Sequence, residues 1–456
     1  MASEGGRRFK RGGPSANHKP CIIPATVAIT VAIAIAIAVA VAIAIAIDSR
    51  RSPSPTPMPH AQVNIGLIGT SWWADSMYLP ALAAHARAVV AALCGRDRGR
   101  AEALAARWQV PRVYTDYRAM FRAENLDAVV IASANDTHHP ATMAALQHGL
   151  HVLCEKPLAL SVAEAAEMTQ AAARAGAVTM VPFTYRFMPS NQFIKALLDD
   201  GYIGRPYHLA MRYYTGFGRA PDYHWRFDKA KAGSGVIGDL GSHFLHLAEW
   251  FYGDITAVTC RASALVKRDP APDRAPYEQT EDNAAFLLEF AGGANGVVTV
   301  SSLAHEPTPF GQRHQFEFHG DAGTLYAEND WDKTEVVRGA RAASDAGLAP
   351  MEIPARHYGA ARRDCVHNTY RDIFRKELRM TGEWVDAILA GRAVQPDFAA
   401  GLRVQRVMDA ALRSAAEGRR VTVDCGDGDA GDRGCDGDAG DGDAGDRDAS
   451  GDRGDK

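Results

Sequence analysis

Apolar and polar stretches alternate between residues 61 and 183 in the manner of buried strands separated by amphipathic helices. Helix-like stretches rich in Ala, Glu and Arg lie between the apolar runs, and Pro157 ends the last of these runs. The predicted strands fall at 63–69, 88–94, 113–117, 127–132 and 151–154. This alternation predicts an α/β domain with a Rossmann-type doubly wound parallel sheet, which we place at residues 61–183.

From residue 184 the pattern changes to short segments rich in Val, Tyr and Phe, which alternate like half-buried strands. These segments are 207–214, 255–265, 284–290, 296–303, 314–318 and 334–338. They predict an α+β domain over residues 184–423 with an open, mostly antiparallel sheet. Residues 381–418 have the period of one or two amphipathic helices, which we expect to pack back against the first domain.

Both ends of the chain differ from the middle. In the leader, residues 1–60, the Ile/Val/Ala run 22–47 is long enough to span a bilayer and follows a basic segment. We favour the interpretation that residues 1–57 are an extension before a natural start at Met58, and a membrane anchor or an export signal is the alternative. The Gly/Asp-rich, acidic tail 424–456 has too few apolar residues for a core, so we expect it to be disordered.

Composition and charge narrow the class of protein. The apolar share of 47% and the charged share of 23% are typical of a globular protein, and the net charge is only −4. No basic stripe suggests a nucleic-acid partner. The seven scattered cysteines lack a paired metal-binding spacing, so we expect reduced thiols, a cytoplasmic location and no metal site. A membrane location follows only if residues 22–47 are genuine.

The first strand runs into a candidate dinucleotide fingerprint. In G-x-G-x-x-G/A terms Gly69 fills the first place, Ser71 the second and Ala74 the third, with Thr70 and Trp72 between them. A turn of this kind presents the amino terminus of a helix to a pyrophosphate. Serine in the second place adds a small side chain where the backbone normally approaches the phosphates.

The end of the second strand bears on which cofactor binds. An acid is expected there to hold the adenosine ribose of NAD, but the chain has Gly95 and Arg96, and Asp97 only afterwards. An arginine in place of the acid suits the 2′-phosphate of NADP, so we favour NADP over NAD. The alternative is that Arg96 is a solvated loop charge and Asp97 contacts the ribose.

Two further groups of residues are candidates for the chemistry. Lys156 lies at the carboxyl end of a strand, where open α/β sheets bind ligands. Asp239 and His243 follow a glycine-rich entry with a four-residue spacing that would place them on one helix face. A histidine can take a hydroxyl proton at neutral pH, and a nearby carboxylate can orient it. A purely structural hydrogen bond is the alternative for such a pair. Trp225 precedes the glycines and either walls the site or belongs to the core.

The order of these motifs resembles the Gfo/Idh/MocA oxidoreductase family over roughly residues 62–423. The resemblance rests on the Gly-rich turn, Asn135-x-x-His138, Glu155-Lys156-Pro157 and the Asp239/His243 pair. It implies that Lys156 contacts both the nicotinamide ribose and the substrate hydroxyl, and that the bond to Pro157 is often cis. It also implies an outer sheet face available for homo-oligomer contacts.

The resemblance assigns further roles and exposes departures from the family pattern. Ser133, Asn135, His138 and Glu155 would lie on the cofactor side, while Tyr185 and Arg186 would border the substrate. Thr184 stands where the family usually has Asn, and His246 stands where it often has an acid. We include His246 among the predicted substrate contacts.

These observations predict an enzyme that transfers hydride between a nicotinamide cofactor and the secondary hydroxyl or carbonyl of a sugar, polyol or related small molecule. His243 would accept the hydroxyl proton, Asp239 would orient it, and Lys156 would stabilise the oxyanion. Two alternatives remain: cleavage of glycosides through transient oxidation with a retained cofactor, and a non-catalytic NADP-binding regulator.

Overall fold

The computed structural model describes residues 62–308, 311–343 and 347–424. The apolar run 22–47, the proposed start at Met58 and nearly all of the acidic tail lie outside these residues. Within them, no helix combines the length and the apolar character needed to cross a membrane.

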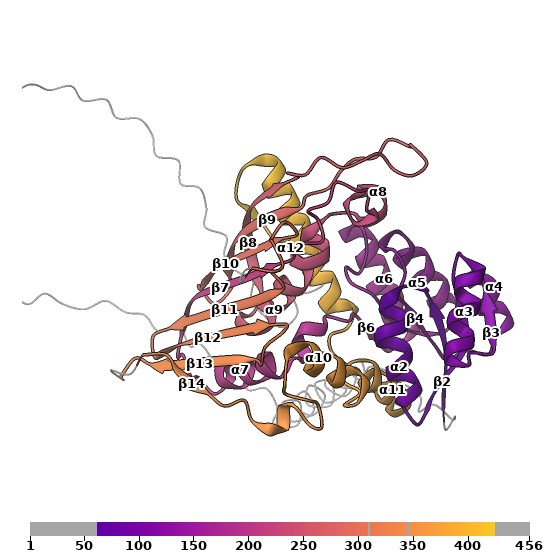
Figure 1. The fold of residues 1–456 in the computed structure, drawn as a ribbon, viewed down its shortest axis with the longest axis horizontal. Helices are drawn as coiled ribbons and strands as arrows, with labels where there is room; N and C mark the ends of the chain where they lie inside the picture. Colours follow the sequence, from indigo (N-terminus) through magenta and orange to yellow (C-terminus); the bar gives the residue numbers. More distant parts are fainter. Residues whose placement is uncertain (1–61, 309–310, 344–346, 425–456) are drawn as a thin grey trace, which may run out of the picture. The chain divides into compact units, whose positions relative to one another are not determined.

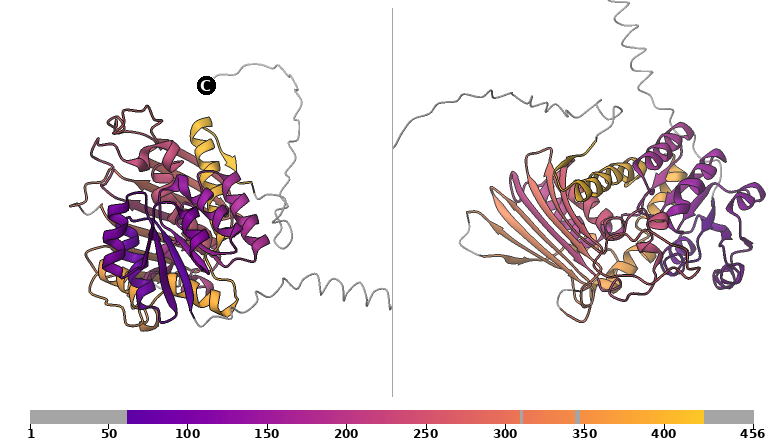
Figure 2. Two further views of the ribbon diagram at one scale, coloured as in Figure 1. Left: turned by 90° about the vertical axis from the view of Figure 1, so that its right-hand side faces the viewer. Right: turned by 90° about the horizontal axis from the view of Figure 1, so that it is seen from above.

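The first sheet is parallel and six-stranded, in the order β3-β2-β1-β4-β5-β6. Its strands are β1 (Val63–Ile68), β2 (Ala88–Cys94), β3 (Arg112–Tyr114), β4 (Ala128–Ile131), β5 (His151–Cys154) and β6 (Thr179–Met180). This confirms the predicted Rossmann sheet, which Figure 2 shows with its strands side by side. The strand order reverses between β1 and β4, and such a switch point opens a crevice at the carboxyl ends of the strands.

Helices cover both faces of this sheet, as Figure 1 shows. They are α2 (Leu79–Ala84), α3 (Arg98–Trp108), α4 (Tyr117–Ala123), α5 (His138–Gln147) and α6 (Val162–Ala175). Carboxylate and hydroxyl side chains cap three of them: Asp97 accepts from Arg100 N before α3, and Asp116 and Ser161 cap α4 and α6. Because β4 and β5 are almost completely buried between these helices, their sequences are continuous apolar runs.

The second sheet has nine strands in the order β14-β13-β12-β11-β7-β10-β9-β8-β15. They are β7 (Pro206–Tyr214), β8 (Ile255–Ser263), β9 (Asn283–Phe290), β10 (Asn295–Ser301), β11 (Arg313–Gly320), β12 (Gly323–Asp330), β13 (Val336–Arg341), β14 (Ala349–Met351) and β15 (Val421–Thr422). All pairs are antiparallel except β7 with β10, which confirms the mostly antiparallel prediction. The sequence pattern missed β12, whose buried face has Leu325 as its only large apolar side chain, beside Gly323, Ala327 and Asn329.

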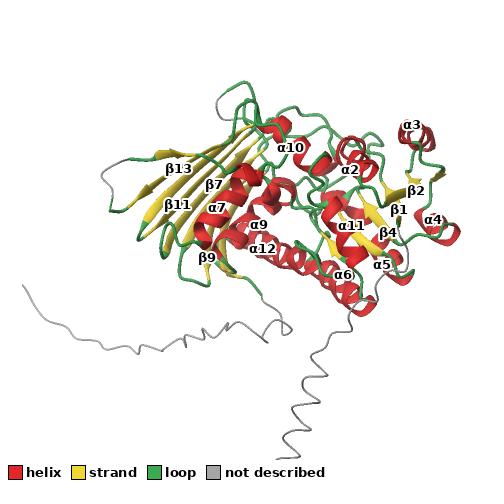
Figure 3. Ribbon diagram, turned by 90° about the horizontal axis from the view of Figure 1, so that it is seen from below, coloured by secondary structure: helices red, strands yellow, loops and turns green. Residues whose placement is uncertain are grey.

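Helices line only one face of the second sheet among the described residues. Figure 3 shows α7 (Pro189–Asp199), α9 (Ser242–Tyr252) and α12 (Phe398–Glu417) along that face. The remaining helices are α8 (Lys229–Ala232), α10 (Val366–Arg375) and α11 (Thr381–Ala390). The predicted amphipathic region 381–418 is therefore two helices. Helix α12 contacts β8 of the second sheet and α6 of the first domain.

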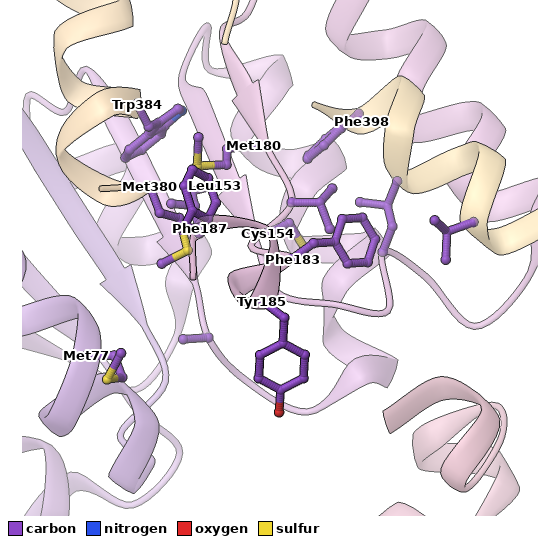
Figure 4. Close-up of a cluster of buried hydrophobic side chains, with 14 of the residues drawn as sticks. Met77, Leu153, Cys154, Met180, Phe183, Tyr185, Phe187, Met380, Trp384 and Phe398 are labelled. Carbon is purple, nitrogen blue, oxygen red and sulfur yellow. The ribbon is translucent and has the colours of Figure 1, made fainter. Parts of the chain in front are cut away.

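A buried cluster joins the two domains where the chain crosses between them. Figure 4 shows Leu153 of β5 beside Phe183 and Phe187, with Trp384 of α11 packing from the other side. The Trp384 indole N–H donates to Val178 O at 3.2 Å. The crossing segment 179–187 is only partly a strand: β6 ends at Met180, and Thr184–Phe187 form a 3₁₀ turn that directs Tyr185 away from this cluster.

Candidate active site

A cavity of about 1130 Å³ lies at the carboxyl ends of the parallel strands and faces the second domain. The turns after β1, β2 and β4 line one wall, and second-domain side chains line the other. The predicted residues that line it are Gly69, Thr70, Ser71, Trp72, Gly95, Arg96, Ser133, Asn135, Glu155, Lys156, Tyr185, Trp225, Asp239 and His243. The sequence thus located both walls, although its motifs lie as far apart as residues 69 and 243.

The turn after β1 is shaped for close backbone approach. Gly69 has φ +119°, and a Cβ there would lie 2.2 Å from Ala132 O, so only glycine fits. Ser71 Oγ accepts from Ala74 N at 3.3 Å and so caps the following helical segment, which opens with a π-helical turn at Ala74–Tyr78. Ala74 itself is fully buried and does not line the cavity. Its small size serves helix packing against the sheet rather than contact with a cofactor.

Arg96 and Asp97 both line the cavity after β2, but only the Asp97 side chain is hydrogen-bonded to the described part of the protein. Asp97 Oδ1 accepts from Arg100 N at 3.0 Å and caps α3. No hydrogen bond or ion pair of the Arg96 side chain occurs within the described ranges, where its charge acts on Asp136. The Arg100 guanidinium donates to Thr70 O at 3.1 Å and ties α3 to the turn after β1.

Glu155 and Lys156 connect the end of β5 to both walls. Glu155 accepts from the Tyr78 hydroxyl and, at 3.1 Å, from Lys156 N. Burial raises the pKa of Glu155. Lys156 Nζ donates to Asp239 O at 2.7 Å and to Asp239 Oδ1 at 2.8 Å, so this lysine crosses from the first domain to the second. The Lys156–Pro157 bond is cis, as the resemblance implied.

Asp239 lies between two cations. Its carboxylate is 3.2 Å from Arg226 Nε as well as 2.8 Å from Lys156 Nζ. Burial by itself raises the pKa of Asp239, but the Arg226 guanidinium and the Lys156 ammonium together hold it well below its ordinary value. The carboxylate is therefore ionised throughout the physiological range and fixes the position of both cations.

His243 stands at the start of α9 with its ring 4.3 Å from that of Tyr185. Burial, followed by the nearby Lys156 charge, lowers the pKa of His243 well below the ordinary value, so the imidazole is neutral and able to accept a proton. Its Nδ1 is buried without a hydrogen-bond partner in the described part of the chain.

Asp239 and His243 share no hydrogen bond within the described residues. Residues Ile237–Gly241 form a π-helical turn, which is wider than the α-helical turn that the four-residue spacing assumed. The Asp239 carboxylate is directed to Lys156 and Arg226 instead. In this geometry Asp239 positions Lys156 directly and acts on His243 only through its charge, which raises the pKa of that histidine.

Besides Ala74, three predicted residues lie outside the cavity lining. His246 is buried and stacks on Phe183 at 4.3 Å, and Arg186 lies over the Trp250 ring at 4.7 Å. Neither side chain lines the cavity in this structure, and their role as substrate contacts stays a prediction. His138 is fully buried with Nδ1 2.9 Å from Pro157 O, so it braces the Glu155–Pro157 segment rather than touching a cofactor.

Sequence reasoning missed several residues that complete the second wall. These are Tyr213, Tyr223, Lys231 and Tyr370, all of which line the cavity. Tyr213 is the clearest case, because its hydroxyl accepts from that of Tyr185 at 3.1 Å. Arg226 also lines the cavity and belongs to the stretch 225–228 that we expected to wall the site. The four missed residues are single polar side chains outside any motif.

Comparison with known proteins agrees with this geometry. Residues 63–183 match the oxidoreductase family with the NAD-binding Rossmann fold, and residues 191–326 match the Gfo/Idh/MocA C-terminal domain. A levoglucosan dehydrogenase of Pseudarthrobacter phenanthrenivorans is 27% identical over 79% of this chain and 98% of its own. An inositol 2-dehydrogenase of Streptomyces avermitilis is 31% identical over 74% of this chain and 87% of its own.

A solved structure is similar over the same region. Levoglucosan dehydrogenase in complex with NADH and levoglucosan has a TM-score of 0.72 and 27% identity, and covers 79% of this chain and 99% of its own. The two family domains occupy the two sheets that line the cavity. This chain belongs to the Gfo/Idh/MocA family and is an NAD-binding oxidoreductase.

Proposed function

We propose that this enzyme oxidises a secondary hydroxyl of a sugar or polyol, and reduces the corresponding carbonyl, with NADP(H) as the preferred cofactor. The observation that carries the proposal is the Lys156–Asp239 contact beside His243, inside a cavity that continues to the Gly69 turn. Relatives named for levoglucosan, inositol and apiose support the substrate class.

The site suits removal of a hydroxyl proton. His243 is neutral at physiological pH because burial lowers its pKa, and it lines the cavity, so its ring can take the proton of a hydroxyl bound beside it. The Lys156 ammonium, held by Asp239, stabilises the oxygen as negative charge develops there. The Tyr185 and Tyr213 hydroxyls lie at the same end of the cavity and orient the neighbouring hydroxyls of the substrate. The bound nicotinamide supplies the hydride chemistry.

The cavity fits a dinucleotide. Its size is at or above the usual range of about 300–1,000 Å³ for ligand pockets, and it runs from the Gly69 turn to Lys156. The preference for NADP rests on Arg96, which carries an uncommitted guanidinium, whereas Asp97 uses a carboxylate oxygen to cap α3. A 2′-phosphate would pair with the Arg96 guanidinium, and a free ribose would need the Asp97 carboxylate.

A substrate panel tests the proposal. The full chain would be mixed with NADP⁺ or NAD⁺ and with hexoses, anhydrosugars, inositols and acyclic polyols, and reduced cofactor would be followed by absorbance. We expect turnover with at least one of these, and a lower KM for NADP⁺ than for NAD⁺. Sugar conversion without net cofactor reduction would support the glycoside-cleavage alternative. Nucleotide binding without turnover of any compound would support the regulator.

We also propose that the uncovered face of the nine-stranded sheet pairs copies of the chain, and that the enzyme works in the cytoplasm. On that face Leu287 of β9 is 57% exposed. Four free cysteines among the described residues suit a reducing compartment. Light scattering of the full chain and of Leu287→Glu tests the pairing, since the charge should shift the mass toward the monomer.

A further inference from the structure

Helix α8 of the second domain reaches the nucleotide side of the cavity. Lys231 and Ala232, on this helix, line the cavity together with the turns after β2 and β4. Asn135 Nδ2 donates to Ala232 O at 3.0 Å, so the β4 turn and α8 are joined directly. The two domains therefore meet above the part of the cavity where the strand ends would hold a dinucleotide.

Cations from both domains gather at this end of the cavity. Arg96 and Arg100 come from the first domain and Lys231 comes from the second. Burial raises the pKa of Asp136, and the positive charges of Arg96 and Lys231 both lower it. Arg96 and Lys231 therefore lie near the same carboxylate. Two cations from different domains thus act on one small region of the wall.

The other acids near these cations are committed to the fold. Asp97 and Asp116 cap the helices α3 and α4. Asp228 caps α8 through Ala230 N at 3.1 Å and accepts from the Tyr223 hydroxyl at 2.9 Å. Cations that line a cavity with few free carboxylates are suited to an anionic group on the ligand.

The position of Lys231 is fixed before any ligand arrives. Its Nζ donates to Tyr223 OH at 2.6 Å and lies 3.3 Å from Asp228 Oδ2. An ammonium has a third N–H, which remains for a ligand. Lys229, on the same helix, provides a contrast, because it pairs with Glu278 at 2.7 Å and does not line the cavity.

We propose that Lys231 binds a phosphate group of the dinucleotide, so that the second domain contributes a cofactor contact and, with the Asn135–Ala232 bond, closes the cavity over the nucleotide. The proposal rests on the proposed function, since it requires the nucleotide to lie in this cavity. The phosphate is either the pyrophosphate shared by both cofactors or the 2′-phosphate found only in NADP.

Nucleotide titration separates these possibilities. NADPH and NADH would be titrated by fluorescence into the full chain, into Lys231→Ala and into the matched control Lys229→Ala. We expect Lys231→Ala to raise the Kd roughly three- to tenfold, as for the loss of one charge-assisted contact, while Lys229→Ala stays within about twofold of the wild type. A loss confined to NADPH identifies the 2′-phosphate, and an equal loss for both identifies the pyrophosphate.

Release kinetics give a second readout. If α8 closes over the nucleotide, Lys231→Ala should release NADPH faster in a stopped-flow displacement experiment, with an unchanged thermal midpoint of the nucleotide-free protein. Equal affinities for wild type and Lys231→Ala, or an equal loss in Lys229→Ala, would overturn the phosphate contact while leaving the proposed function intact. Failure of the wild type to bind either nucleotide would instead remove the proposed function.

Discussion

The two walls of the cavity differ in the groups that form them. The first-domain wall consists of backbone at strand ends, where Gly69 and the turns after β2 and β4 shape the surface. The second-domain wall consists of side chains, among which Asp239, Arg226 and His243 come from helical turns. Lys156 starts in the first wall and hydrogen-bonds to the second, as Asn135 of the β4 turn also does. Under the proposed function, the first wall carries most of the cofactor contacts and the second wall carries the proton acceptor His243.

The largest expected effect comes from the second wall. His243→Asn removes the proton acceptor while keeping a polar side chain of moderate size, so kcat should fall by roughly 10²–10⁴-fold. The Kd for NADPH should stay within a few-fold of the wild type, because His243 is not among the proposed nucleotide contacts. Steady-state kinetics and fluorescence titration measure the two quantities. A parallel loss of both would remove the division between the walls.

Asp239→Asn tests the contact between the walls. Without this carboxylate, Lys156 and Arg226 lose their shared counter-charge, and breaking such a largely buried pair costs about 3 kcal/mol of the free energy of unfolding. Asp386→Asn is the control, because Asp386 pairs with His85 and Arg87 but is 52% exposed. That change should cost less than about 1 kcal/mol. Urea unfolding of both variants measures the difference, and equal losses would show that the Lys156 contact is no more than a surface pair.

The first wall is tested by a backbone change. Gly69→Ala would place a Cβ 2.2 Å from Ala132 O at φ +119°, so the turn has to move. Gly149→Ala is matched, since Gly149 has φ +72° but no atom within 4 Å of the added Cβ. We expect about 1 kcal/mol of destabilisation for Gly149→Ala from the left-handed conformation alone. Gly69→Ala should lose more stability and also most of its NADPH affinity. Unchanged nucleotide binding would mean that this turn does not cradle the phosphates.

The sequence predicted the first wall of the cavity better than the second. The first five strands of the first sheet and the residues of their turns were predicted from local sequence, because apolar runs and glycines at turns are properties of neighbouring residues, whereas the two-residue β6 was not. Strand β12 was missed because Leu325 is the only large apolar side chain on its buried face, and the other buried positions are Gly323, Ala327 and Asn329. The positions of Arg186 and His246 outside the cavity lining could not be read from spacing, because the 3₁₀ turn Thr184–Phe187 and helix α9 determine which side chains face the cavity.

Tyr213 and Lys231 could not have been found from spacing at all. Each reaches the cavity because residues distant in sequence hold its element there, as the Asn135–Ala232 bond holds α8.

The smallest expected effect concerns a buried histidine behind the second wall. His314 is 0% exposed, and both ring nitrogens are without a partner in the described part of the chain. Burial lowers its pKa from 6.5 to about 3. Between these values the unfolded chain binds one more proton at this site, so stability falls as the pH falls, by about 1.4 kcal/mol per pH unit. His314→Leu should reduce the overall pH slope by this one-proton share, because His138, His243 and His246 keep their own contributions. Urea unfolding of the variant and of the wild type at several pH values would show the difference. An unchanged slope would mean that the histidine is protonated in the folded state.

The measurement that tests the central claim most directly is the pH dependence of kcat/KM for the wild-type enzyme with its best substrate. This quantity reports the pKa of the essential base in the free enzyme. Because burial lowers the pKa of His243, the account predicts that activity persists below the ordinary histidine pKa of about 6.5 and declines only at lower pH. An acid limb centred at or above about 6.5 would contradict a buried, neutral His243 as the proton acceptor.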